Sequence, residues 1–239
     1  MAKDTAEPET PPDKPPAPAH GGHRQRLRER FLTGDAAALP DYELLEVLLF
    51  NVIDRVDVKP LAKALLREFG SLGGVLAADP ARLLAYDRVN ERTLALFKCV
   101  RETSRRMLRE RIVDRPLLSS WSALVDYCRA SLVHEPVERF RILFLDRKNR
   151  LIADEEQQRG TVDHTSLYPR EVIKRALELG ATALILVHNH PSGDPTPSAA
   201  DIEMTREVKA VAEKLGIALH DHIVVAGAGA SSLRALGVI

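Results

Sequence analysis

The chain has 239 residues, of which 45% are hydrophobic, and its 34 basic side chains balance its 34 acidic ones. This length and apolar content suffice for one large domain or two modest ones with real cores. A net charge of zero excludes a protein whose overall field attracts nucleic acid or an anionic membrane, so any such preference has to be local.

The cysteines and the N-terminal segment indicate a cellular compartment. Cys99 and Cys128 are the two cysteines, and their spacing fits neither a metal site nor a redox motif. The N-terminus has charges and prolines where a secretory signal has an apolar core, and no apolar run approaches the roughly 20 residues that span a bilayer. We therefore expect a cytoplasmic protein in a reducing environment, with no membrane segment.

The first part of the chain divides into a tail and a helical region. Residues 1–20 contain six prolines and no large apolar residue beyond Met1, which predicts a disordered tail. Residues 21–112 have helical periodicity throughout, which predicts a small domain of short helices. The helix boundary signals are Asp41 as a cap, Gly70 after a helix, Asp79 as an N-cap before Pro80, and Asn90 before a longer helix.

The longer helix after Asn90 carries a cluster of arginines in its second half, and the region 21–118 is the basic part of the chain. This pattern fits a solvated helix face. It also fits a weak contact with a phosphate backbone, because clustered arginines release counterions when they meet nucleic acid. Residues 113–118 are the predicted linker to the next domain. The clustered arginines are Arg101, Arg105, Arg106, Arg109 and Arg111.

Residues 119–239 show a different pattern, in which strands alternate with helices. This alternation predicts an α/β domain with at least one parallel crossover. The predicted strands are 138–146, 150–156, 181–188 and 218–227, and the predicted helices are 168–179 and about 199–215.

The segment "HNHPSGDPTPSAAD", residues 188–201, follows a buried strand and precedes a helix. In a strand Asn189 faces one side of the sheet while His188 and His190 face the other. Both imidazoles therefore point to one place at the carboxyl end of a strand, which is where open α/β sheets bind ligands.

Two interpretations of Ser198 and Asp201 remain open at this point. The pair matches a capping box, in which the two residues do no more than satisfy amides at a helix start. A capping box leaves the histidines unexplained, whereas two histidines and a carboxylate are the three ligands that a catalytic zinc ion takes, with water as the fourth. The HNH nucleases are excluded, because their three named residues are spread through a ββα-metal fold.

The spacing His188-x-His190, seven residues, Ser198, two residues, Asp201 is that of the JAMM motif, which marks the zinc-dependent branch of the MPN (JAB1) superfamily. With "YPREV", "FLDRKN" and "DHIVV", the chain from about residue 22 onward resembles the RadC (UPF0758-type) family of bacterial proteins. The resemblance implies a helix-hairpin-helix-like N-terminal domain followed by an MPN-like mixed β-sheet flanked by helices over 119–239, an α+β or α/β chain.

The resemblance also implies a site and an activity. One Zn²⁺ per chain would be held by His188, His190 and Asp201, with Glu138 as the general base and Ser198 as the donor to the oxyanion. The expected enzyme is a zinc metalloprotease or related hydrolase that cleaves a peptide or isopeptide-like amide in an unidentified peptide or protein. Glu155 and Glu156 compete with Glu138 for the role of base.

The N-terminal domain departs from the pattern of the resemblance. Helix-hairpin-helix modules use a Gly-x-Gly hairpin whose amides reach a phosphate, and residues 89–92 contain no glycine. We therefore expect at most a weak DNA contact through this domain. The alternative function is a DNA-associated repair or recombination protein with a structural or vestigial zinc site.

Overall fold

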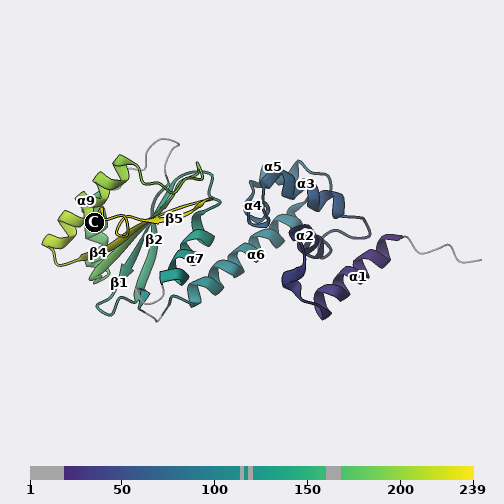
Figure 1. Ribbon diagram of the computed structural model, residues 1–239, viewed down its shortest axis with the longest axis horizontal. Coiled ribbons are helices and arrows are strands. Elements are labelled where there is room, and N and C mark those ends of the chain that lie inside the picture. Colours follow the sequence, from purple (N-terminus) through teal and green to yellow (C-terminus); the bar gives the residue numbers. More distant parts are fainter. Residues whose placement is uncertain (1–18, 114–115, 118–120, 160–167) are drawn as a thin grey trace, which may run out of the picture.

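The computed structural model describes residues 19–113, 116–117, 121–159 and 168–239 (Figure 1). The tail predicted over 1–20 lies outside the described residues except for its last two, which begin the first helix. The linker predicted over 113–118 also lies partly outside them. No helix in the described ranges is long and apolar enough to cross a membrane.

The N-terminal part is all helical and packs around one apolar core that includes Leu45, Leu65 and Phe97. Each fully buried side chain of this size contributes about 1.5–3 kcal/mol to folding. The elements are α1 (Ala19–Thr33), a short 3₁₀ turn (Ala36–Ala38), α2 (Asp41–Leu49), α3 (Lys59–Phe69), α4 (Leu72–Ala77), α5 (Pro80–Leu84) and α6 (Glu91–Glu110).

Most of the predicted helix boundary signals are confirmed. Gly70 follows α3 with φ of 80°, a conformation that glycine adopts without strain. The Asp79 carboxylate accepts hydrogen bonds from two amides at the start of α5, and the Asn90 side chain does the same for α6. These caps are local, so the sequence around each boundary is enough to predict it.

The prediction for Asp41 was wrong by one residue. Pro40 is the N-cap of α2 and makes no side-chain capping bond, while Asp41 is the first helical residue. A carboxylate in the first turn still interacts favourably with the helix dipole, which accounts for an acidic residue at this position.

The C-terminal part is a mixed five-stranded sheet in the order β2-β1-β3-β4-β5. The predicted parallel crossover is confirmed, since β3 and β4 are parallel and α9 connects them, while the other pairs are antiparallel. The elements are α7 (Trp121–Leu132), β1 (Arg139–Leu145), β2 (Leu151–Arg159), α8 (Pro169–Glu178), β3 (Ala183–Asn189), α9 (Ala199–Lys214), β4 (Ala218–Ala226) and β5 (Gly229–Ser232).

Helices cover both faces of this sheet. Helices α8 and α9 pack on the face that contains Leu184 and Leu186, and α7 packs on the opposite face with Ile185 and Val187. Neither α7 nor β5 was predicted from the sequence. The buried residues of α7 follow helical spacing, whereas β5 has only four small residues and exists because it pairs with β4.

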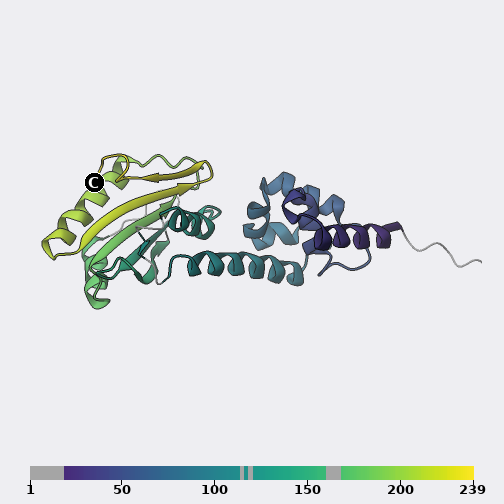
Figure 2. The ribbon, with the colours of Figure 1, turned by 60° about the horizontal axis from the view of Figure 1, so that its bottom comes forward.

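Helix α6 joins the two parts of the chain (Figure 2). Its N-terminal half contributes Phe97 to the core of the helical part. Its C-terminal half places Leu108 against the core beneath α7, where Ile112 is fully buried. Side chains from one continuous helix therefore belong to both cores.

Candidate metal centre

The topology of the sheet brings four of the predicted site residues together. Strand β1 runs antiparallel to β3, with Phe140 opposite His188, so the start of β1 lies beside the end of β3. Glu138 immediately precedes β1, and Asp201 lies in the first turn of α9. One ligand atom from each of Glu138, His188, His190 and Asp201 lies within 4.8 Å of the others.

The distances within this group are compatible with a tetrahedral zinc site. His188 Nε2 lies 2.9 Å from His190 Nε2. The Asp201 oxygens lie 3.3 Å from His188 Nε2 and 3.4 Å from His190 Nε2. Two ligand atoms that are each about 2.0–2.1 Å from a tetrahedral zinc are about 3.4 Å apart, so these three side chains fit the ion with little movement.

Glu138 occupies the outer side of the group. Its Oε1 lies 3.8 Å from His188 Nε2, farther than either Asp201 oxygen. The Glu138 side chain is 27% exposed, against 0% for His188 and 11% for Asp201. A molecule arriving from solvent can therefore meet Glu138 beside the three deeper residues.

The histidine rings are held through their other nitrogens. His190 Nδ1 lies 2.9 Å from the Asp194 carbonyl oxygen. A carbonyl can only accept, so His190 Nδ1 carries the proton and Nε2 presents a lone pair to the site. His188 Nδ1 contacts His222 Nε2 at 2.8 Å, so its Nε2 also faces the site.

The charges of the group favour a bound cation. The Asp201 hydrogen bond raises the pKa of His190. Burial raises the pKa of Asp201, but the close approach of the His188 and His190 rings outweighs burial and holds that pKa well below its ordinary value. Carboxylate oxygens this close to the lone pairs of two imidazole nitrogens repel them unless a proton or a metal ion lies between. Two nitrogens and one carboxylate form a donor set that zinc takes.

Ser198 and Asp201 also form the capping box that was one of the two open interpretations. Ser198 Oγ accepts a hydrogen bond from the Asp201 amide at 3.1 Å and donates one to Asp201 Oδ2 at 2.7 Å. Asp201 Oδ2 accepts from the Ser198 amide at 2.7 Å. The two interpretations are compatible, because the same carboxylate caps α9 and faces the histidines.

Asn189 is a functional candidate that the sequence analysis left without a role. Its side-chain amide donates to the carbonyls of Glu135 and Val137, and its Oδ1 accepts from the Arg139 amide at 2.8 Å. These bonds fasten the segment on both sides of Glu138 to the histidine strand. The alternation that turns Asn189 away from the imidazoles was the available signal.

The two competing glutamates lie elsewhere on the sheet. Glu155 pairs with Arg175 at 2.7 Å. Glu156 pairs with Arg139 at 3.2 Å and lies 3.7 Å from Arg141. Within the described ranges, the group around the histidines includes Glu138 and neither of these residues.

The clustered arginines of α6 are mostly engaged with carboxylates. Arg101 pairs with Glu135 at 2.5 Å, and both Arg105 and Arg106 pair with Glu102. Their positive charge is therefore partly neutralised within the protein. In the preceding turn, the left-handed φ of 72° falls on Arg88, so an arginine takes the conformation that glycine adopts more readily.

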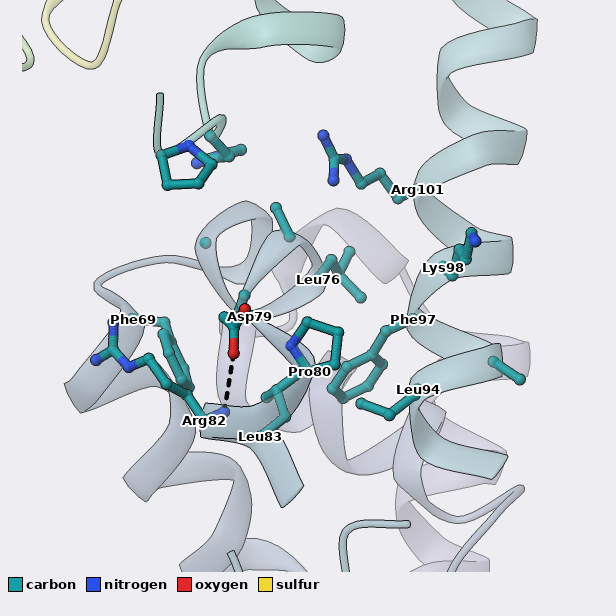
Figure 3. A pocket seen from close by; sticks show the side chains of 16 residues that line it. Phe69, Leu76, Asp79, Pro80, Arg82, Leu83, Leu94, Phe97, Lys98 and Arg101 are labelled. Carbon is teal, nitrogen blue, oxygen red and sulfur yellow. Dashed lines mark hydrogen bonds between the residues drawn. The ribbon is translucent and has the colours of Figure 1, made fainter. Parts of the chain in front are cut away.

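A separate hollow of about 600 Å³ lies between α4, α5, α6 and the segment that follows α7 (Figure 3). Its walls are mainly apolar, with Leu76 and Phe97 among them, and Lys98 and Arg101 lie at its edge. It shares no residue with the group around the histidines. The hollow is therefore a different feature from the candidate metal centre.

Comparison with known proteins gives matches over most of the chain. A family model described as a RadC-like JAB domain matches residues 118–238. A UPF0758 protein of Rhodobacter capsulatus is 61% identical over 213 residues, which cover 89% of this chain and all of the relative. A UPF0758 protein of Ruegeria pomeroyi is 56% identical over 217 residues, which cover 91% of this chain and 97% of the relative.

Proposed function

Because this chain belongs to the RadC family, we propose that it is a JAMM-type zinc hydrolase. Its expected substrate is a peptide or isopeptide-like amide. The observation that carries the proposal is the placement of Glu138, His188, His190 and Asp201 within 4.8 Å of one another. The matched JAB domain contains all four residues.

The roles follow from the position of each side chain. A zinc ion held by His188, His190 and Asp201 would lower the pKa of water and polarise a substrate carbonyl. Glu138, on the exposed side of the group, would accept a proton from the attacking water and return it to the leaving amine. Ser198 would donate a hydrogen bond to the oxyanion, for which its hydroxyl must turn away from Asp201.

Because the substrate is not identified, the proposal is tested by offering the protein many different amides in one experiment. Zinc-loaded protein is incubated with a mixed peptide pool and with peptides joined through a lysine side chain, and new termini are detected by mass spectrometry. We expect cleavage that ends when a chelator removes zinc and returns when zinc is restored. Cleavage that persists in the chelated protein would contradict the assignment of the activity to this centre.

Replacing Ser198 with alanine separates capping from metal binding. We expect Ser198→Ala to retain zinc, because the hydroxyl is not one of the proposed ligands. Loss of the cap should lower the free energy of unfolding by about 0.5–2 kcal/mol. Chemical denaturation and elemental analysis of the same sample measure both effects, and loss of all zinc would show that the hydroxyl is needed to hold Asp201 in place.

The alternative, a DNA-associated protein with a structural zinc site, predicts salt-sensitive binding. We expect weak and unspecific binding, because the hairpin lacks its glycines and most of the α6 arginines are paired. Arg106 and Arg109 are exposed, and Arg106→Glu with Arg109→Glu should reduce the slope of log affinity against log salt by about 1–2. Fluorescence anisotropy at several salt concentrations measures this slope, and tight binding that survives both changes would favour the alternative.

A further inference from the structure

A buried histidine lies behind the candidate metal centre, on the strand next to the histidine strand. His222 is in β4, opposite Leu186 of β3, and its side chain is fully buried. Its Nε2 lies 2.8 Å from His188 Nδ1, and its Nδ1 lies 2.6 Å from Thr205 Oγ1 of α9. His222 therefore links one proposed ligand to the helix that carries another.

The positions of the protons in this series of hydrogen bonds follow from the contact at its Thr205 end. Thr205 Oγ1 lies 2.5 Å from the Asp201 carbonyl oxygen, and because a carbonyl can only accept, the threonine hydroxyl donates there. The same hydroxyl has no second proton, so it must accept from His222 Nδ1. His222 Nδ1 is therefore protonated.

The environment of His222 assigns its other nitrogen. The His222 ring is fully buried, and its two nitrogens contact Thr205 and His188, neither of which is a carboxylate. A positive charge on this ring would be buried without an anionic partner, so the ring is neutral and Nε2 has a lone pair. His222 Nε2 must accept from His188 Nδ1, which leaves His188 Nε2 without a proton. Phe140 stacks on the His188 ring with an interplanar angle of 6°, so the orientation of the ring is fixed by packing as well.

We propose that His222 and Thr205 are positioning residues that hold His188 in the Nδ1-protonated tautomer, with Nε2 available to a metal ion. This inference rests on the proposed function, because it assigns the reason for the arrangement to metal binding. Hydrogen bonds of this kind fix the tautomer and orientation of ligand histidines and raise their basicity. Here the hydrogen bonds run from the His188 ring to the Asp201 backbone carbonyl, so one network joins a proposed ligand to the helix that carries another.

A set of matched variants separates positioning from simple packing. His222→Leu removes the acceptor for His188 while keeping an apolar filling. His222→Gln keeps an acceptor and a donor in the same place, and Thr205→Val removes the acceptor for His222. His220→Leu is the control, because His220 lies on the same strand but contacts Asn149 instead of a residue of the candidate metal centre.

Two measurements test the proposal on these proteins. Zinc affinity is measured by competition with a chromophoric chelator, and we expect His222→Leu to weaken binding by about 10- to 100-fold. Thr205→Val should weaken binding less, His222→Gln should recover most of the affinity, and His220→Leu should match wild type. Wild-type affinity in a folded His222→Leu variant would overturn the proposal, and if that variant does not fold, loss of affinity in His222→Gln equal to that in Thr205→Val would do so.

The second measurement is long-range ¹H–¹⁵N correlation of the histidine rings in the metal-free protein. We expect His188 to be protonated on Nδ1 in wild type and in His222→Gln, and to be a mixture of tautomers in Thr205→Val. A wild-type His188 protonated on Nε2 would overturn the proposal. This readout needs no zinc, so it tests the role of His222 even if wild type binds no zinc and the proposed function fails.

Discussion

The wild-type protein is expected to bind about one zinc ion per chain, and replacing His188, His190 or Asp201 with alanine is expected to remove it. Each side chain is one of three proposed ligands, and the next nearest group, Glu138, has its Oε1 3.8 Å from His188 Nε2. With two protein ligands left, water fills the remaining coordination positions and the affinity falls, so the ion should be lost on dialysis. Elemental analysis after reconstitution and dialysis gives the zinc content directly.

The control for this loss is a histidine outside the group. His134 is exposed, lines the separate hollow and is not part of the group around the histidines, so His134→Ala should keep its zinc. Circular dichroism on each variant distinguishes loss of a ligand from loss of the fold. The assignment fails if a folded His190→Ala variant keeps a full zinc ion, or if reconstituted wild type retains none.

Replacing Glu138 with glutamine is expected to reduce the cleavage rate by about 10² to 10⁴ while zinc stays bound. Glutamine keeps the shape of the side chain, and the backbone around position 138 stays hydrogen-bonded to Asn189. The glutamine amide cannot accept the proton from water. Because Glu138 is not one of the three proposed ligands, zinc content should match wild type. Turnover of the best substrate from the peptide screen, measured at saturating zinc, gives the rate.

Glu155→Gln is the matched control for the base. It makes the same chemical change on a glutamate that pairs with Arg175 and lies outside the histidine group. We expect it to leave the rate unchanged. A loss in Glu155→Gln alone would reassign the base, and equal rates in both variants and wild type would contradict the assignment of Glu138 as the base.

The features that the sequence predicted well depend on neighbouring residues. Asp79 and Asn90 cap helices through amides two or three positions away, so a short window contains both partners. The convergence of His188 and His190 follows from the alternation of side chains along a strand. Asp201 is brought near them because the connecting loop is short and ends in a capped helix.

The features that the sequence did not predict depend on partners far away in the chain. Asn189 contacts backbone groups about fifty residues earlier, and His222 contacts His188 across two adjacent strands. Arg101 resembles a free basic residue in the sequence because its partner, Glu135, follows in a later segment. Such pairs form only when tertiary packing sets the distances, which a local pattern cannot provide.

The most direct test of the centre is a crystal structure of the zinc-loaded protein with diffraction data collected on both sides of the zinc absorption edge. We expect one anomalous peak, bound by His188 Nε2, His190 Nε2 and the Asp201 carboxylate at about 2.0–2.2 Å, with Glu138 beyond bonding distance. Zinc held elsewhere would contradict the assignment of the site. Zinc closed off by Glu138 as a fourth protein ligand would contradict its role as a base and with it the hydrolytic function.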